Sequence, residues 1–232
     1  MFSKKLDNPE ILFSQIQSYS TIMSGGFGLC GIPENCIDFL AKYEPKNLTV
    51  ISNNIGNAGK GLVKLLKKNL ISKAVCSYVG GNPDLEQRIL AGDIEVTITP
   101  QGTFIEKIRA AGAGIPAFYT RTGADTEVEV GKETRMFNNQ KYLLEESLSA
   151  DFAIIKASMG DEFGNLYFEG ASRNFSPLMA MAAKTTIVEV EQLVEIGVIQ
   201  PEKVHLPGIF VQHIFQGKNY KNDIEFLIED EK

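Results

Sequence analysis

The sequence contains no apolar run long enough to cross a membrane. A transmembrane helix needs about 20 consecutive, predominantly apolar residues, and no stretch of the 232-residue chain approaches that length. Lys4 and Lys5 stand near the amino terminus, but no apolar core follows them, which argues against a secretory signal. We therefore expect a cytoplasmic protein with no membrane partner.

Cysteine and histidine are also scarce. Cys30, Cys36 and Cys76 are odd in number and form no C-x-x-C pair, so they indicate reduced, packed thiols and not a disulfide framework or a zinc site. His205 and His213 stand eight positions apart with no third ligand beside them. This spacing is not typical of a metal centre, and we expect no metal.

Positive charge is in deficit. The chain has 23 lysines and arginines against 29 aspartates and glutamates, a formal net charge of -6. Nucleic-acid binding requires a basic surface, so a nucleic-acid partner is excluded, while a local loop could still bind an anionic small molecule. Four lysines, Lys60, Lys64, Lys67 and Lys68, fall on one expected helix and indicate a solvated helix face.

Short β-rich runs alternate with amphipathic stretches along most of the chain. This pattern predicts an α/β fold, a mostly parallel open sheet flanked by helices. Strands are expected at residues 20–24, 48–52, 74–79, 95–99, 115–119, 152–157 and 185–190. Helices are expected at residues 33–43, 59–68, 84–91, 104–111 and 177–183, with a further helix starting at Asn8. The alternation breaks between Thr122 and Tyr142, where residues 127–132 predict a hairpin or an extended excursion. The absence of a linker predicts one domain over 1–232.

The loops that leave the carboxyl ends of parallel strands usually form the ligand site. Here they are residues 25–31, 53–59, 80–83 and 100–103, with 158–174 as a fifth region. Four of the five are rich in glycine, asparagine or glutamine, which let backbone amides approach a ligand.

The most informative loop reads SGGFGLCGIPE at residues 24–34. Free backbone N–H groups and the start of a helix at Pro33 predict an anion site. Gly26, Gly28 and Gly31 match the dinucleotide pattern G-x-G-x-x-G, but the second strand ends in NNIGN at 53–57, without the required acidic residue. No G-K-[ST] triplet occurs either, so nicotinamide and P-loop chemistry are disfavoured. The alternative is a tight turn that only packs a helix on the sheet.

Several ordered motifs resemble the family I coenzyme A-transferases. They lie at residues 24–33, 52–54, 77–80, 99–103, 112–120, 171–175, 189–191 and 205–207. The resemblance covers nearly the whole chain and implies the Rossmann-like fold of that family. It is closest to A-type subunits that move CoA between succinate and a 3-oxoacid such as acetoacetate. Such a chain works with a B-type subunit in an A2B2 heterotetramer and uses CoA as a substrate, with no permanently bound cofactor.

The resemblance also implies roles for individual residues. The CoA-binding segment would comprise Ser24, Gly25, Gly26, Phe27, Gly28, Leu29 and Cys30. Gln101, Asn53 and Asn54 would contact the substrate or a developing oxyanion, although the same amides could simply stabilise turns. The family's covalent glutamate is expected in the B-type subunit. Glu169 is the nearest look-alike here, and its surroundings do not match.

Two positions depart from the family pattern. Glu169-Gly170 stands where basic residues are usual, and Gly81 stands where a glutamate is often found. Two other functions remain open at this point. One is a CoA-transferase of the acetate or butyrate–acetoacetate type, and the other is a non-catalytic ligand-binding protein on the same fold.

Overall fold

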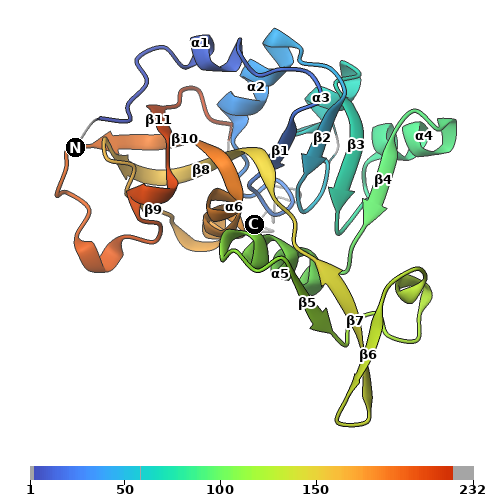
Figure 1. Cartoon of the computed structure of the whole chain (residues 1–232). Helices are drawn as coiled ribbons and strands as arrows, with labels where there is room; N and C mark the ends of the chain where they lie inside the picture. The colour runs from blue at the N-terminus through green and yellow to red at the C-terminus, as the bar shows by residue number, and fades with distance from the viewer. Residues whose placement is uncertain (1–2, 58, 222–232) are drawn as a thin grey trace, which may run out of the picture.

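The centre of the molecule is a parallel sheet in the order β11-β10-β8-β1-β2-β3-β4 (Figure 1). The computed structural model describes residues 3–57 and 59–221. The strands of this sheet are β1 (Thr21–Ser24), β2 (Leu48–Ile51), β3 (Ile71–Cys76), β4 (Glu95–Ile98), β8 (Ala150–Asp161), β10 (Ala183–Val194) and β11 (His213–Gln216). The short β9 (Leu166–Tyr167) pairs antiparallel with β8. The prediction of a mostly parallel open sheet is confirmed.

Helices cover both faces of the sheet. They are α1 (Pro9–Phe13), α2 (Glu34–Tyr43), α3 (Val63–Lys67), α4 (Pro83–Ala91), α5 (Gln101–Gly112) and α6 (Ser176–Ala182). Single 3-10 turns are η1 (Glu127–Glu129), η2 (Gly170–Arg173), η3 (Pro201–Lys203) and η4 (Gly208–Phe210). Among the described residues, no helix combines the length and the apolar character needed to cross a membrane.

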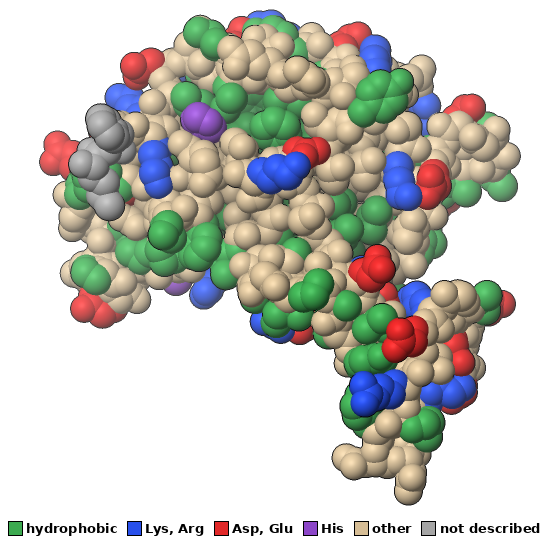
Figure 2. All heavy atoms as spheres, in the orientation of Figure 1, with side chains coloured by type: hydrophobic (Ala, Val, Ile, Leu, Met, Phe, Trp, Pro, Cys, Tyr) green, Lys and Arg blue, Asp and Glu red, His purple; other side chains and the backbone are tan. Residues whose placement is uncertain are grey.

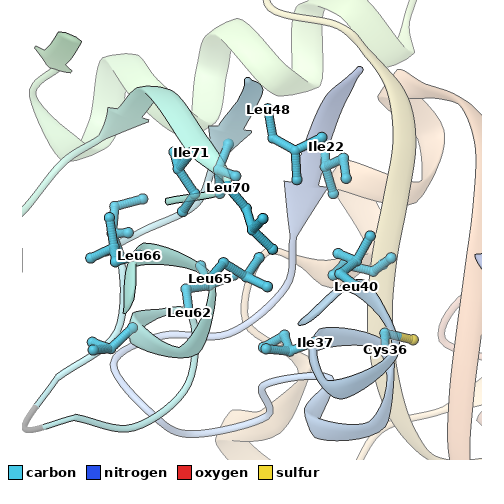
Figure 3. Packing of buried hydrophobic residues seen from close by; sticks show 14 of the residues in the cluster. Ile22, Cys36, Ile37, Leu40, Leu48, Leu62, Leu65, Leu66, Leu70 and Ile71 are labelled. Atoms are coloured by element: carbon cyan, nitrogen blue, oxygen red, sulfur yellow. The ribbon is translucent and has the colours of Figure 1, made fainter. Parts of the chain in front are cut away.

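The alternation of side chains along each strand separates the core into two layers. Ile22 of β1 packs in a cluster with Leu40 of α2 and Leu65 of α3 (Figure 3). The next residue, Met23, packs on the opposite face with Phe104 of α5. Helices α1 to α4 therefore cover one face, and α5 and α6 cover the other.

A separate antiparallel sheet projects from the body as an arm (Figures 1 and 2). It contains β5 (Ala117–Thr120), β6 (Thr134–Phe137) and β7 (Gln140–Glu146) in the order β5-β7-β6. The strand expected at 115–119 thus lies in the arm. The break in the alternation between Thr122 and Tyr142 falls in this arm. The hairpin or extended excursion predicted at 127–132 is wrong for those residues, because residues 127–129 form η1. The actual turn is at Asn138 and Asn139, whose φ values of 48° and 59° suit a tight hairpin.

Several element boundaries differ from the prediction. The strand expected at 74–79 ends at Cys76, because the Ser77 N–H bonds to the Asn53 carbonyl at 3.1 Å and begins the following loop. The helix expected at 59–68 is shortened to α3, since Gly59 and Gly61 adopt φ values of 80° and 62°. Both glycines therefore keep the preceding residues out of the helix.

The strand order places a topological switch at β1. The chain passes from β1 to β4 in one direction, and β8 then pairs with the other side of β1. Loops that follow β1 and β8 diverge at such a point, which is where open α/β sheets bind ligands. The glycine-rich loop leaves the sheet here.

A buried carboxylate occupies the start of α2. Glu189 of β10 is fully buried, and its Oε2 accepts a hydrogen bond from the Cys36 N–H at 2.7 Å. Lys156 is its neighbour across the β8–β10 register. The positive end of the helix dipole favours a carboxylate there, but burial dominates and raises the pKa of Glu189 to about 7.

Replacing Glu189 by glutamine should flatten the pH dependence of stability. The pKa of about 7 in the folded protein exceeds the ordinary value of 4.5, so the folded state binds this proton more tightly than the unfolded state. The carboxyl group therefore makes the free energy of unfolding fall as the pH rises from 4.5 to about 7. Glu189→Gln stays neutral and can still accept from Cys36. Urea denaturation across the interval checks this, and parallel curves for both proteins would contradict it.

Candidate active site

Polar side chains from neighbouring strand ends meet at one edge of the parallel sheet. Ser24 ends β1, Asn53 and Ser77 follow β2 and β3, and Gln101 follows β4. Hydrogen bonds join three of them. Asn53 Nδ2 donates to Gln101 Oε1 at 2.8 Å and to Ser77 Oγ at 3.1 Å. The Ser77 hydroxyl also donates to Gln101 Oε1.

Asn53 connects this cluster to the glycine-rich loop. Its Oδ1 accepts a hydrogen bond from the Gly28 N–H at 3.2 Å, while its Nδ2 bonds to Gln101. The Asn53 side chain is buried, at 4% exposure. One asparagine therefore fixes the distance between the loop and the Gln101 amide.

The amide nitrogen of Gln101 is left as an unused donor. Its Oε1 has two donors, whereas Nε2 is buried and has no hydrogen-bond partner among the described residues. The residue lies in the first turn of α5 and not in a loop, because the Phe104 N–H already bonds to the Pro100 carbonyl at 2.8 Å. An unmet buried donor costs roughly 1–3 kcal/mol. A ligand oxygen at this position would remove that cost.

Most backbone N–H groups of the glycine-rich loop already have acceptors within the protein and are not free to bind an anion. Phe27 and Cys30 exchange both backbone hydrogen bonds, at 3.1 and 3.0 Å. The Gly25 N–H donates to the Ile154 carbonyl. The Gly26 N–H donates to Asn174 Oδ1, and the Gly28 N–H donates to Asn53 Oδ1. At the start of α2, the Cys36 amide is taken by Glu189. The expectation of free amides converging on an anion is therefore wrong for these groups, because the protein itself satisfies them.

The seven residues predicted to bind CoA differ in accessibility. Ser24 and Leu29 are buried, at 0% and 3% exposure, so their side chains support the loop from inside. Phe27 is 53% exposed, and its ring centre lies 5.9 Å from that of Phe175. Asn54 Oδ1 accepts a hydrogen bond from the Gly56 N–H at 3.1 Å, which is a local turn contact.

A pocket of about 230 Å³ lies between the loop and strands β8 and β10. Three carboxylates line it, from Glu34, Glu169 and Glu191, together with the ammonium of Lys156. Lys156 pairs with Glu191 at 2.8 Å. The excess of negative charge disfavours a phosphate here, and Glu169, the departure noted in the sequence, contributes to it.

Sequence reasoning assigned no role to two residues of this region. Ser77 completes the cluster around Gln101, and Asn174 bonds to the loop from the far side of β1. Both lie within motifs that resemble the family, and Ser77 directly follows a buried strand. The position of Ser77 just after a strand could have indicated its role. The hydrogen bond between Asn174 and Gly26 joins positions 148 residues apart, and no local sequence pattern indicates such a contact.

Comparison with known proteins settles the family. The coenzyme A transferase family model matches residues 7–217. The chain belongs to the coenzyme A transferase family. It is 48% identical to the A subunit of the succinyl-CoA:3-ketoacid coenzyme A transferase of Helicobacter pylori strain J99, over 96% of each chain. This family membership and the names of these relatives make the protein a CoA-transferase enzyme.

Two longer proteins align with this coenzyme A transferase over about half their length. The human mitochondrial succinyl-CoA:3-ketoacid coenzyme A transferase 2 is 43% identical over 95% of this chain and 46% of its own length. The crystal structure of an acyl-CoA transferase apoenzyme from Escherichia coli O157:H7 superimposes with a TM-score of 0.83. That match has 22% identity and covers 93% of this chain and 47% of the other. The second comparison bears on the fold alone.

Gly31→Ala should destabilise the transferase more than Gly114→Ala does. Both glycines have nearly the same left-handed backbone, with φ of 71° and 72°, so both variants bear a cost of about 1–2 kcal/mol. A Cβ on Gly31 would also lie 2.7 Å from the Ser172 carbonyl oxygen, whereas one on Gly114 would meet nothing within 4 Å. Free energies of unfolding of the two variants measure the difference. Equal losses would mean that Ser172 does not restrict Gly31.

Proposed function

We propose that the chain is the A-type subunit of a succinyl-CoA:3-oxoacid CoA-transferase that moves CoA between succinate and acetoacetate. The observation that carries the proposal is the buried, unused Nε2 donor of Gln101, held beside the glycine-rich loop by Asn53. A neutral donor suits a carboxylate substrate and the oxyanion formed when a thioester is attacked. The high identity to relatives named for this reaction supports the choice of substrates.

The proposed reaction is a ping-pong exchange through a glutamate of the partner chain. Its carboxylate attacks the carbonyl carbon of the succinyl-CoA thioester and expels CoA thiolate, which leaves a mixed succinyl-glutamyl anhydride. The thiolate then attacks the glutamyl carbonyl, which releases succinate and leaves a glutamyl-CoA thioester. Acetoacetate reverses these steps and departs as acetoacetyl-CoA. Dividing one acyl exchange into such steps lowers each barrier.

The residues of this chain would supply binding and orientation. Gln101 Nε2 would donate to the acid or to the tetrahedral oxyanion, and Ser77 and Asn53 would hold its other end. The loop from Ser24 to Cys30 would contact CoA through its exposed Phe27 and its backbone surface. Asn54 would act through the turn that it bonds. The phosphates of CoA would lie away from the acidic pocket behind the loop.

The side chains gathered at the carboxyl edge support a partner of B type. In the cluster formed by Asn53, Ser77 and Gln101, the functional groups are amides and a hydroxyl. Glu169 is exposed and lines the pocket between the loop and strands β8 and β10. An A2B2 assembly in the cytoplasm completes the proposal.

The isolated chain should not exchange CoA between succinate and acetoacetate. Activity should appear only when the separately purified B-type subunit is added, because the covalent carboxylate would come from that chain. The assay follows acetoacetyl-CoA formation by each chain alone and by the mixture. Mass spectrometry after incubation with succinyl-CoA should place the CoA thioester on the partner. Turnover by the isolated chain, or an adduct on Glu169, would refute the divided site.

Gln101→Ala should lower kcat of the assembled enzyme roughly 10²- to 10³-fold, the usual effect of removing one oxyanion donor. Gln101→Glu should be worse, since its charge would repel the carboxylate substrate. Gln87→Ala is the matched control, because Gln87 is an exposed glutamine of α4. Both half-reactions are assayed after size-exclusion chromatography confirms assembly with the partner chain. Unchanged kcat in Gln101→Ala would remove this residue from the site.

A further inference from the structure

The side chain of Asn174 bonds to both limbs of the glycine-rich loop. Its Oδ1 accepts a hydrogen bond from the Gly26 N–H at 3.1 Å. Its Nδ2 donates to the Cys30 carbonyl at 3.3 Å and to the Ser172 carbonyl at 2.7 Å. The Asn174 amide therefore holds the first part of the loop at Gly26 and its last part at Cys30, and links both to the segment before α6.

Two glycines of the loop fit the segment that carries Asn174. A Cβ on Gly25 would lie 2.5 Å from Ser176 Oγ. A Cβ on Gly31 would lie 2.7 Å from the Ser172 carbonyl oxygen and 2.8 Å from Asn174 Nδ2. The bare faces of these glycines are thus turned toward residues 172–176. Their small size serves the contact between loop and segment.

Asn174 and Asn53 hold the loop from opposite sides of β1. Asn174 precedes α6, on the β8 side, and bonds to Gly26, whereas Asn53 follows β2 and bonds to Gly28. Only Asn53 also bonds to Gln101. If the bond from Asn174 is lost, the loop keeps its link to Gln101 and the backbone bond from Gly25 to Ile154 of β8, but Gly26 loses its bond to the segment before α6.

We propose that Asn174 is a positioning residue that sets the place of the glycine-rich loop relative to the Gln101 amide. This inference rests on the proposed function, in which CoA contacts the loop and Gln101 contacts the acid. Asn174 acts through the Gly26 and Cys30 backbone and not on the substrate. A loop displaced by about 1 Å can lower turnover by roughly 10²-fold.

The backbone of Asn174 allows its side chain to be tested separately. Its φ of 28° and ψ of -123° lie outside the regions that L-residues ordinarily occupy. Alanine would disturb both the backbone and the bonds. Glycine accepts such a backbone readily, so Asn174→Gly removes only the side chain. Asn69→Gly is the matched control, since Asn69 is an exposed asparagine with φ of 55°.

Asn174→Gly should leave the thermal midpoint of the assembled enzyme close to that of the wild type. Amide hydrogen exchange at Gly26 should accelerate roughly tenfold, the effect of losing one hydrogen bond, while exchange at Gly28 changes less. The value of kcat should fall roughly tenfold to a hundredfold, with a smaller change in KM. Asn69→Gly should alter none of these three quantities.

Asn174→Asp adds a pH readout that a merely structural residue would not give. The carboxylate can accept from the Gly26 N–H but cannot donate to either carbonyl; once protonated, its single O–H can donate to one of the Cys30 and Ser172 carbonyls. Activity relative to wild type should therefore recover as pH falls toward the ordinary aspartate range, near a pKa of about 4. A ratio independent of pH would count against the donor role of Nδ2.

Two outcomes overturn the proposal. The first is wild-type exchange at Gly26 in Asn174→Gly, and the second is an activity loss that simply follows the thermal midpoint. Failure of the proposed function would look different. In that case the wild-type complex would not transfer CoA from succinyl-CoA, yet the exchange at Gly26 would still report whether Asn174 fixes the loop.

Discussion

The backbone amides of the turn after β1 are the constraint on which the site depends. A turn buried against the sheet cannot leave its N–H groups without acceptors. Backbone carbonyls accept from Gly25, Phe27 and Cys30. Asn53 and Asn174 provide the acceptors for Gly28 and Gly26, each through its Oδ1. The nitrogen of each side chain is then available for a second task. In Asn53 it orients Gln101, and in Asn174 it fastens the returning limb at Cys30.

The charges around the loop follow from this internal bonding. The start of α2 would attract an external anion if it were open, but the Glu189 carboxylate lies there, at 2.7 Å from the Cys36 amide. The pocket behind the loop is lined by three more carboxylates. The carboxyl edge beside Gln101 is instead formed by amides and a hydroxyl. The carboxylate substrate that we propose would therefore meet the least electrostatic repulsion beside the unused donor of Gln101.

The sequence was sufficient for the parallel sheet, the strand-end loops and the family, because strand alternation and short motifs are local signals. It also placed Gln101 and Asn53 at the same edge, since strand ends of a parallel sheet share one side. It did not reveal that the loop amides have internal partners. The Glu189 contact joins positions 153 residues apart, and the Asn174 contact joins positions 148 apart. Such pairs depend on tertiary packing, which periodicity does not record. The hairpin at Asn138 and Asn139 was missed because a run of charged residues at 127–132 looked more extended than it is.

The proposed division of the site between two chains agrees with the free-energy cost of burying unpaired polar groups in each chain before assembly. A buried neutral amide without a partner costs roughly 1–3 kcal/mol, which a folded chain can bear at Gln101. A buried, unpaired carboxylate costs far more, or takes up a proton and loses its nucleophilicity. Glu189 illustrates the second outcome, since burial raises its pKa to about 7 even with a hydrogen bond from Cys36. A nucleophilic carboxylate placed beside Gln101 in this chain would face the same penalty. In the proposed two-chain site, a carboxylate brought by the partner chain would stay solvated until the chains meet, and the Gln101 donor would find its oxygen only after assembly.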